Sequence, residues 1–198
     1  LIWNSGQIAS GEAPNGGKLI TPTGAYAKLA TSGTKYFENM LWENSGTIDI
    51  NEGYIYFNIN TLASQTPSST GLRNNSSGVV NINGAMSYND STPYLSLNAY
   101  GNSGFTPSID NFGTINWQPY SPSNTNFYGF VFNNHGLFNI LKDMNFYGLS
   151  GNDTGTYQIA AGVTFGLSSA YRSFSSTANI TGTGTFNIYS GSVVDILG

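Results

Sequence analysis

Residues 46–53 read GTIDINEG, and two later stretches repeat the pattern: residues 155–162 read GTYQIAAG and residues 184–191 read GTFNIYSG. A glycine opens each stretch. Apolar residues stand two and four positions after that glycine, and a polar residue stands between them. Alternation with a period of two is typical of a β-strand that has one buried face and one face in water. The pattern therefore predicts a repeated strand.

The motif recurs along most of the chain. The clear units are GTIDI from Gly46, GVVNI from Gly78, GTINW from Gly113, GLFNI from Gly136, GTYQI from Gly155 and GTFNI from Gly184. A weaker copy, GKLIT, begins at Gly17, and Gly6 is a candidate start for another. Several opening glycines follow Asn or Ser, which like glycine favour corners, so we expect a positive φ to explain them. The uneven spacing between units predicts long loops, at 62–71, 87–108 and 118–126.

Such a unit cannot bury its apolar face alone. The same residue types recur at the same offset in every unit, as they would if each strand lay on its copy at about 4.8 Å. Isoleucine would then lie on isoleucine, and amide on amide. We therefore predict an all-β fold, a single-stranded right-handed parallel β-solenoid of about six to eight irregular coils forming one domain over residues 1–198. The alternative is an antiparallel β-sandwich or jelly roll.

Composition excludes several classes of protein. Charged residues make up 8% of the 198 residues, against about 25% in an average soluble domain. Aromatic residues make up 14%, enough to build a core. The six basic residues are scattered and the net charge is -4, so nucleic acid is not an expected partner. No apolar run is long enough for a transmembrane helix, so we expect no membrane insertion.

The absence of cysteine excludes disulfides and thiolate metal sites. Low charge together with abundant Asn, Ser, Thr and Gly favours an extracellular or cell-surface protein over a cytosolic one.

Residues 44–50 (NSGTIDI) and 111–117 (NFGTINW) resemble the repeats of filamentous-haemagglutinin-type adhesin stalks and autotransporter passenger domains. The resemblance implies a β-helical stalk with a role in adhesion rather than in catalysis. It assigns no function to any individual residue. The repeat pattern runs to both ends of the chain, so we expect either a segment of a longer repeat protein or a subunit that stacks end to end, with loop-capped ends as the alternative.

The candidates for catalysis are weak. Glu43 and Asp110 each stand three residues before an opening glycine. If one coil separated them in a shared column, they would lie about 10 Å apart, near the upper end of the separation in inverting glycosidases. Asn75 and Asn133 hold the same sequence position, which favours two solvated corner acids instead. The only histidine, His135, has no adjacent acid, so it is expected at a corner.

We predict neither a cofactor nor a metal site. The stretch GNDTG at 151–155 lacks the spaced oxygen ligands of a calcium loop. A threonine column that could order water as ice-binding surfaces do is interrupted by Val79 and Leu137. Its expected members are Thr47, Thr114, Thr156 and Thr185.

Tyrosines on the loop side are the predicted binding residues, because aromatic rings stack on sugar faces. They are Tyr54, Tyr56, Tyr88, Tyr94, Tyr100, Tyr120 and Tyr128. N-glycosylation sequons, relevant if the source is eukaryotic, begin at Asn74, Asn75, Asn89, Asn152 and Asn179.

The sequence thus predicts a non-enzymatic extracellular structural protein: a stalk or adhesin segment or a filament subunit. Its expected partners are further copies of itself, or a glycan or protein on a cell surface. The alternative is a carbohydrate-binding or carbohydrate-cleaving β-helix.

Overall fold

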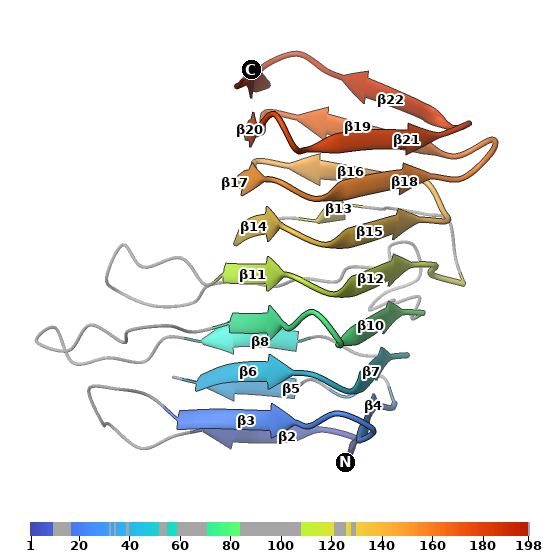
Figure 1. Cartoon of the computed structure of the whole chain (residues 1–198). Coiled ribbons are helices and arrows are strands. Elements are labelled where there is room, and N and C mark those ends of the chain that lie inside the picture. The colour runs from blue at the N-terminus through green and yellow to red at the C-terminus, as the bar shows by residue number, and fades with distance from the viewer. Residues whose placement is uncertain are drawn as a thin grey trace, which may run out of the picture.

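The computed structural model describes residues 1–9, 17–31, 33, 35–38, 40–51, 55–58, 71–83, 108–120, 126–127 and 130–197. Within these ranges the secondary structure consists of strands without a helix, and every strand pairing is parallel. The strands stack in register along one axis (Figure 1). The predicted parallel β-solenoid is therefore confirmed, and the antiparallel sandwich is wrong. The right-handed sense of the coil stays a prediction.

Four sheets form the solenoid. The first sheet contains β1 (Ile2–Trp3), β4 (Tyr26–Leu29), β7 (Thr47–Ile50), β10 (Val79–Ile82), β12 (Thr114–Trp117), β15 (Leu137–Ile140), β18 (Thr156–Ile159) and β21 (Asn179–Gly182). The second sheet contains β3 (Gly17–Thr21), β6 (Met40–Asn44), β9 (Gly71–Asn74), β11 (Ser108–Asn111), β14 (Val131–Asn134), β17 (Ser150–Asp153), β20 (Tyr171–Phe174) and β23 (Val193–Ile196). The third sheet contains β2 (Gly6–Ala9), β5 (Lys35–Glu38) and β8 (Ile55–Asn58). The fourth contains β13 (Asn126–Phe127), β16 (Met144–Tyr147), β19 (Thr164–Ser168) and β22 (Thr185–Ile188).

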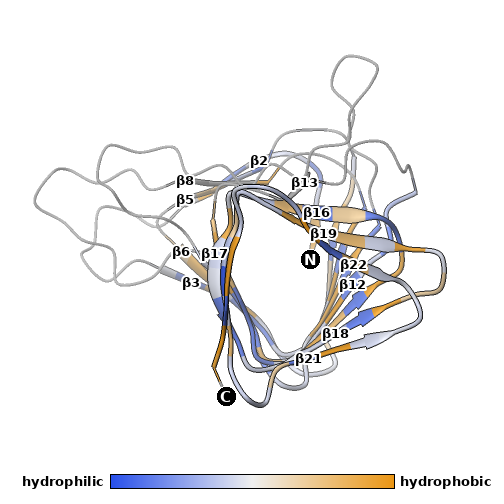
Figure 2. Cartoon of the chain, turned by 90° about the horizontal axis from the view of Figure 1, so that it is seen from above, coloured by the Kyte–Doolittle hydropathy of each residue, from blue (hydrophilic) through white to orange (hydrophobic). Residues whose placement is uncertain are grey.

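The chain visits these sheets in a fixed order: the first sheet, then the third or fourth, then the second. The eight strands of the first sheet mark eight turns, at the upper end of the predicted range. Seen along the axis, the strands enclose one shared interior (Figure 2). Turns whose three faces are described have three strands rather than the two that the repeat suggested. The strand that sequence reasoning missed belongs to the second sheet and ends just before the opening glycine.

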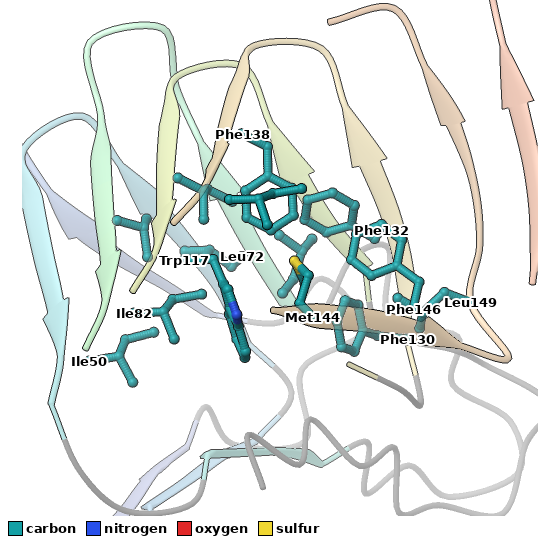
Figure 3. Packing of buried hydrophobic residues seen from close by; sticks show 14 of the residues in the cluster. Ile50, Leu72, Ile82, Trp117, Phe130, Phe132, Phe138, Met144, Phe146 and Leu149 are labelled. Atoms are coloured by element: carbon teal, nitrogen blue, oxygen red, sulfur yellow. The ribbon is translucent and has the colours of Figure 1, made fainter. Parts of the chain in front are cut away.

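The predicted vertical columns are present. Ile50 pairs with Ile82, Ile82 with Trp117, and Trp117 with Ile140. All four side chains are buried, and Ile50, Ile82 and Trp117 lie in successive turns of the same core (Figure 3). Further into the chain the core becomes aromatic, since the rings of Phe132, Phe138, Phe146, Tyr157 and Phe165 contact one another.

Two of the predicted units belong to other faces. GKLIT from Gly17 forms β3, in the second sheet. GTFNI from Gly184 forms β22, which pairs with β19 in the fourth sheet. The candidate start at Gly6 lies in the third sheet. Every face of a solenoid has one buried side, so alternation alone does not tell one face from another.

Gly6 has the positive φ that was predicted for opening glycines, but the opening glycines of the first-sheet units serve a different purpose. Gly78, Gly113 and Gly136 do not have a positive φ. A Cβ on Gly113 would overlap the backbone oxygens of Gly78 and Asn75, and a Cβ on Gly136 would overlap that of Gly113. Glycine is needed here because one turn of backbone presses directly on the previous one.

Positive φ does explain the glycines that close two of the units. Gly162 has φ 73° and Gly191 has φ 78°. The corresponding Gly53 lies outside the described residues.

Replacing Gly113 with Ala should destabilise the fold by at least about 1–3 kcal/mol, the range for overpacking a well-packed site. The added methyl group meets backbone atoms, which cannot rotate away. Urea denaturation measures the change, with Ser76→Ala in an exposed turn as the control. A Gly113→Ala protein as stable as the control would contradict the close-stacking explanation.

Candidate functional site

A ladder of buried asparagines runs through the corner between the second and first sheets. Its members are Asn44, Asn74, Asn111 and Asn134, each fully buried. Each of the first three donates from Nδ2 to the Oδ1 of the next, at 2.8, 2.9 and 2.8 Å. Further hydrogen bonds reach backbone oxygens, such as Asn74 Nδ2 to Thr114 O at 3.1 Å. The buried amides are therefore satisfied, as polar groups in a core must be.

The ladder ends at a buried ion pair. Asp153 takes the next position, and its Oδ1 accepts the backbone N–H of Asn134 at 3.1 Å. Arg172 donates to the Asp153 carboxylate from Nε at 3.0 Å and from Nη2 at 2.6 Å. The hydroxyl of Tyr157 donates to the same carboxylate at 2.7 Å. Both charged side chains are fully buried.

The Arg172 side chain reaches its partners through space left by the missing side chain of Gly151. It passes Gly151, where a Cβ would lie 2.5 Å from Nη1, and Nη1 donates to Phe132 O at 2.7 Å. The guanidinium carbon also lies 5.8 Å and 5.3 Å from the ring centroids of Phe132 and Phe146. Asp153 belongs to the GNDTG stretch, and this pairing occupies its carboxylate inside the core.

A second ladder lies on the outer face of the first sheet. Asn139 donates to Asn116, Asn116 to Asn81, and Asn81 to Asp49, over 2.8, 2.7 and 2.8 Å. The Tyr26 hydroxyl donates to Asp49 Oδ2 at 2.6 Å. This ladder confirms the predicted stacking of amide on amide.

A shorter outer ladder runs beside it. Gln118 donates to Asn83 over 2.8 Å, and Asn83 donates to Asn51 over 2.9 Å.

Glu43 and Asp110 do share a column with one turn between them, but Arg73 occupies that turn. Asn75, expected there from its position, instead donates to Ser45 Oγ at 3.0 Å. Asn75 follows the end of β9, and β9 ends four residues before its opening glycine, whereas β6, β11 and β14 end two residues before theirs.

Both acids have partners of their own. Lys18 donates to Glu43 at 2.7 Å, and Asn133 donates to Asp110 at 2.7 Å. The column is a series of paired side chains rather than an open carboxylate pair.

His135 is a corner residue, as predicted. Its ring stacks on Phe112 with centroids 4.7 Å apart, and its Nδ1 lies 2.8 Å from Thr154 Oγ1.

The threonine column is shorter than predicted. Thr47, Thr114 and Thr156 share one column with the two interrupting residues. Thr185, in contrast, lies on β22 of the fourth sheet.

Of the predicted tyrosines, Tyr120 is described in full, and it is 77% exposed. The side chain of Tyr56, on β8, is not described. Tyr54, Tyr88, Tyr94, Tyr100 and Tyr128 lie outside the described residues. Exposed tyrosines that sequence reasoning missed include Tyr147, Tyr171 and Tyr189. Tyr147 could have been identified from the alternation along residues 144–147 (MNFY), where Met144 and Phe146 point inward and Tyr147 points outward.

The sequon asparagines differ in access. Asn74 is buried in the inner ladder, so its amide is not available for modification in the folded chain. Asn75 is half-buried, whereas Asn152 and Asn179 are exposed. Asn89 lies outside the described residues.

Within the described residues, no three His, Cys, Asp or Glu side chains gather in a way that could hold a metal ion. A search of the same residues finds no helix with the length and apolar character needed to cross a membrane. Comparisons with protein-family models, curated proteins and solved structures give no match for this chain. The class is therefore defined by the fold alone: a parallel β-solenoid with asparagine ladders.

Arg172→Met should cost about 3–5 kcal/mol of folding stability, because it leaves the Asp153 carboxylate buried without its partner. Adding Asp153→Asn should recover part of the loss. Lys18→Met, which breaks the exposed pair with Glu43, is the matched control and should cost about 0–1 kcal/mol. Urea denaturation of the four proteins compares them. Equal losses at the buried and exposed pairs would contradict this account.

Stability should also fall in alkali. Burial raises the pKa of Tyr157 well above its ordinary value, the Arg172 charge opposes that rise, and Asp153 adds to it. A raised pKa in the folded state means that the stabilisation is complete below the unfolded value of about 10 and is lost as the pH rises above it. Denaturation between pH 8 and 11 should show a steeper loss for the wild type than for Tyr157→Phe. Identical slopes would contradict the assignment.

Proposed function

We propose that this chain is a non-enzymatic structural protein, a stiff solenoid segment of an extracellular or cell-surface stalk, adhesin or filament. The observation that carries the proposal is the unbroken register of eight parallel turns in the first sheet. Each turn rests on the one before it through strand hydrogen bonds on several faces, so bending requires many bonds to deform together.

The ladders support a mechanical role. When side-chain amides are hydrogen-bonded in a row, each amide polarises the next and strengthens its hydrogen bond. In the described residues such chains run along the axis inside the core and on its outer surface. They add stiffness in the direction in which a stalk is loaded.

The eighth turn supports contact with another β-coil. Ile180 and Ile196 continue columns that face inward in earlier turns, as the register of β18 and β20 shows. They are nevertheless 36% and 81% exposed, and Ile188 is 54% exposed. β21, β22 and β23 are edge strands of their sheets, and an apolar edge favours the addition of a further parallel strand. A second copy stacked end to end would cover it.

Negative-stain microscopy of the purified chain tests this proposal. End-to-end rods or fibres are expected, because burying three exposed isoleucines favours association. Ile196→Lys should shorten or abolish the fibres, since it would place a charge in the contact, whereas Ser76→Lys, in an exposed turn in the middle of the stack, should not. Dispersed wild-type monomers at high concentration would contradict the filament form of the proposal.

A further inference from the structure

The outer side of the fourth sheet carries a group of exposed tyrosines. Tyr147 ends β16, pairs with Ser168 of β19, and is 53% exposed. Tyr189 directly follows β22, and its N–H donates to Leu167 O at 2.8 Å, so it lies in the same column one turn after Ser168 and two turns after Tyr147. Tyr189 is 46% exposed. Tyr171, at the adjoining corner where β20 begins, is 62% exposed.

The Tyr189 ring is held in place. A Cβ on Gly166 would lie 2.6 Å from Tyr189 Cε2 and 3.3 Å from Cδ2. The ring therefore lies on bare backbone at a position where any other residue would displace it. The Asn187 amide donates to the Tyr189 hydroxyl at 3.2 Å. A ring fixed in this way loses little conformational entropy when it binds a ligand.

Polar groups fill the space between the rings. Asn145 donates to Ser168 Oγ at 2.9 Å, and Ser168 lies in the turn between Tyr147 and Tyr189. Two turns separate the tyrosines, or about 10 Å along the axis. The described outward-facing residues of the fourth sheet are Asn145, Tyr147, Thr164, Gly166, Ser168, Thr185 and Asn187. None of them carries a charge.

We infer that Tyr147, Tyr189 and the adjoining Tyr171 form a platform that binds an uncharged polysaccharide. The C–H faces of sugar rings stack on aromatic rings, and hydroxyl and amide side chains match sugar hydroxyls. The two tyrosines of the column hold separate sugar units of one glycan chain lying along the solenoid axis, with Ser168 in the turn between them and Asn145 hydrogen-bonded to Ser168. The uncharged surface selects a neutral glycan over a sulfated or acidic one. The site does not depend on whether the chain forms fibres.

Affinity gel electrophoresis and pull-down with the whole chain test the platform. The probes are cellulose, xylan, chitin and mannan, with heparin as the charged comparison. At least one neutral glycan should retard the wild type. Tyr147→Ala and Tyr189→Ala should each weaken binding about three- to tenfold. Tyr189→Phe, which keeps the ring, should bind close to wild type. Tyr120→Ala, at an exposed tyrosine outside the platform, should bind as the wild type does.

Circular dichroism of each variant separates loss of binding from loss of folding. The platform is overturned if none of the four neutral glycans binds, if heparin alone binds, or if the alanine variants at Tyr147 and Tyr189 bind like the wild type. Microscopy measures assembly and the gels measure glycan binding. A failure of the glycan-binding proposal is therefore distinguishable from a failure of the rod proposal.

Discussion

The close contact between one turn of backbone and the next is the constraint on which this structure depends. Where Gly78, Gly113 and Gly136 follow one another, the chain passes so near the preceding turn that no side chain fits. This contact fixes the register, and the register then fixes which side chains form each column. A core that would otherwise need individual packing at every level is built by stacking similar residues.

The asparagine ladders follow from the same register, and their directions differ. The inner ladder donates toward later turns and leads to Asp153. The outer ladder donates toward earlier turns and ends at Asp49. The outer chain of amides ends on a carboxylate, which stabilises its aligned dipoles. The last inner amide, Asn134 Nδ2, donates to Thr156 O instead, and the Asp153 carboxylate accepts the backbone N–H of Asn134. Only the inner carboxylate is buried deeply enough to need a guanidinium partner.

The sequence predicted the parts of the fold that depend on local alternation. The first sheet was found through residues such as Ile48, Val80 and Ile115, whose side chains alternate with amides. Apart from GKLIT in β3, most of the second sheet was missed, because strands such as SGND in β17 and YRSF in β20 lack the glycine-led alternation of the first sheet. The Arg172 ion pair was missed for a related reason: its three partners lie on different strands, and only the register brings them together. Tyr189 could not be recognised because the feature that positions it is the absent side chain of Gly166.

The interior and the exterior of the solenoid therefore differ in how freely they can change. A substitution at Asn111 would affect two neighbours in the ladder and the carbonyl of Leu137 at once. A substitution at Tyr147, in contrast, changes a side chain more than half exposed. The effects of two substitutions on the free energy of unfolding should add at such outer positions. They should not add within the ladder, because neighbouring asparagines share hydrogen bonds. Outer side chains can vary without disturbing the stack, because the contacts that hold the turns together use the backbone and the inward side chains.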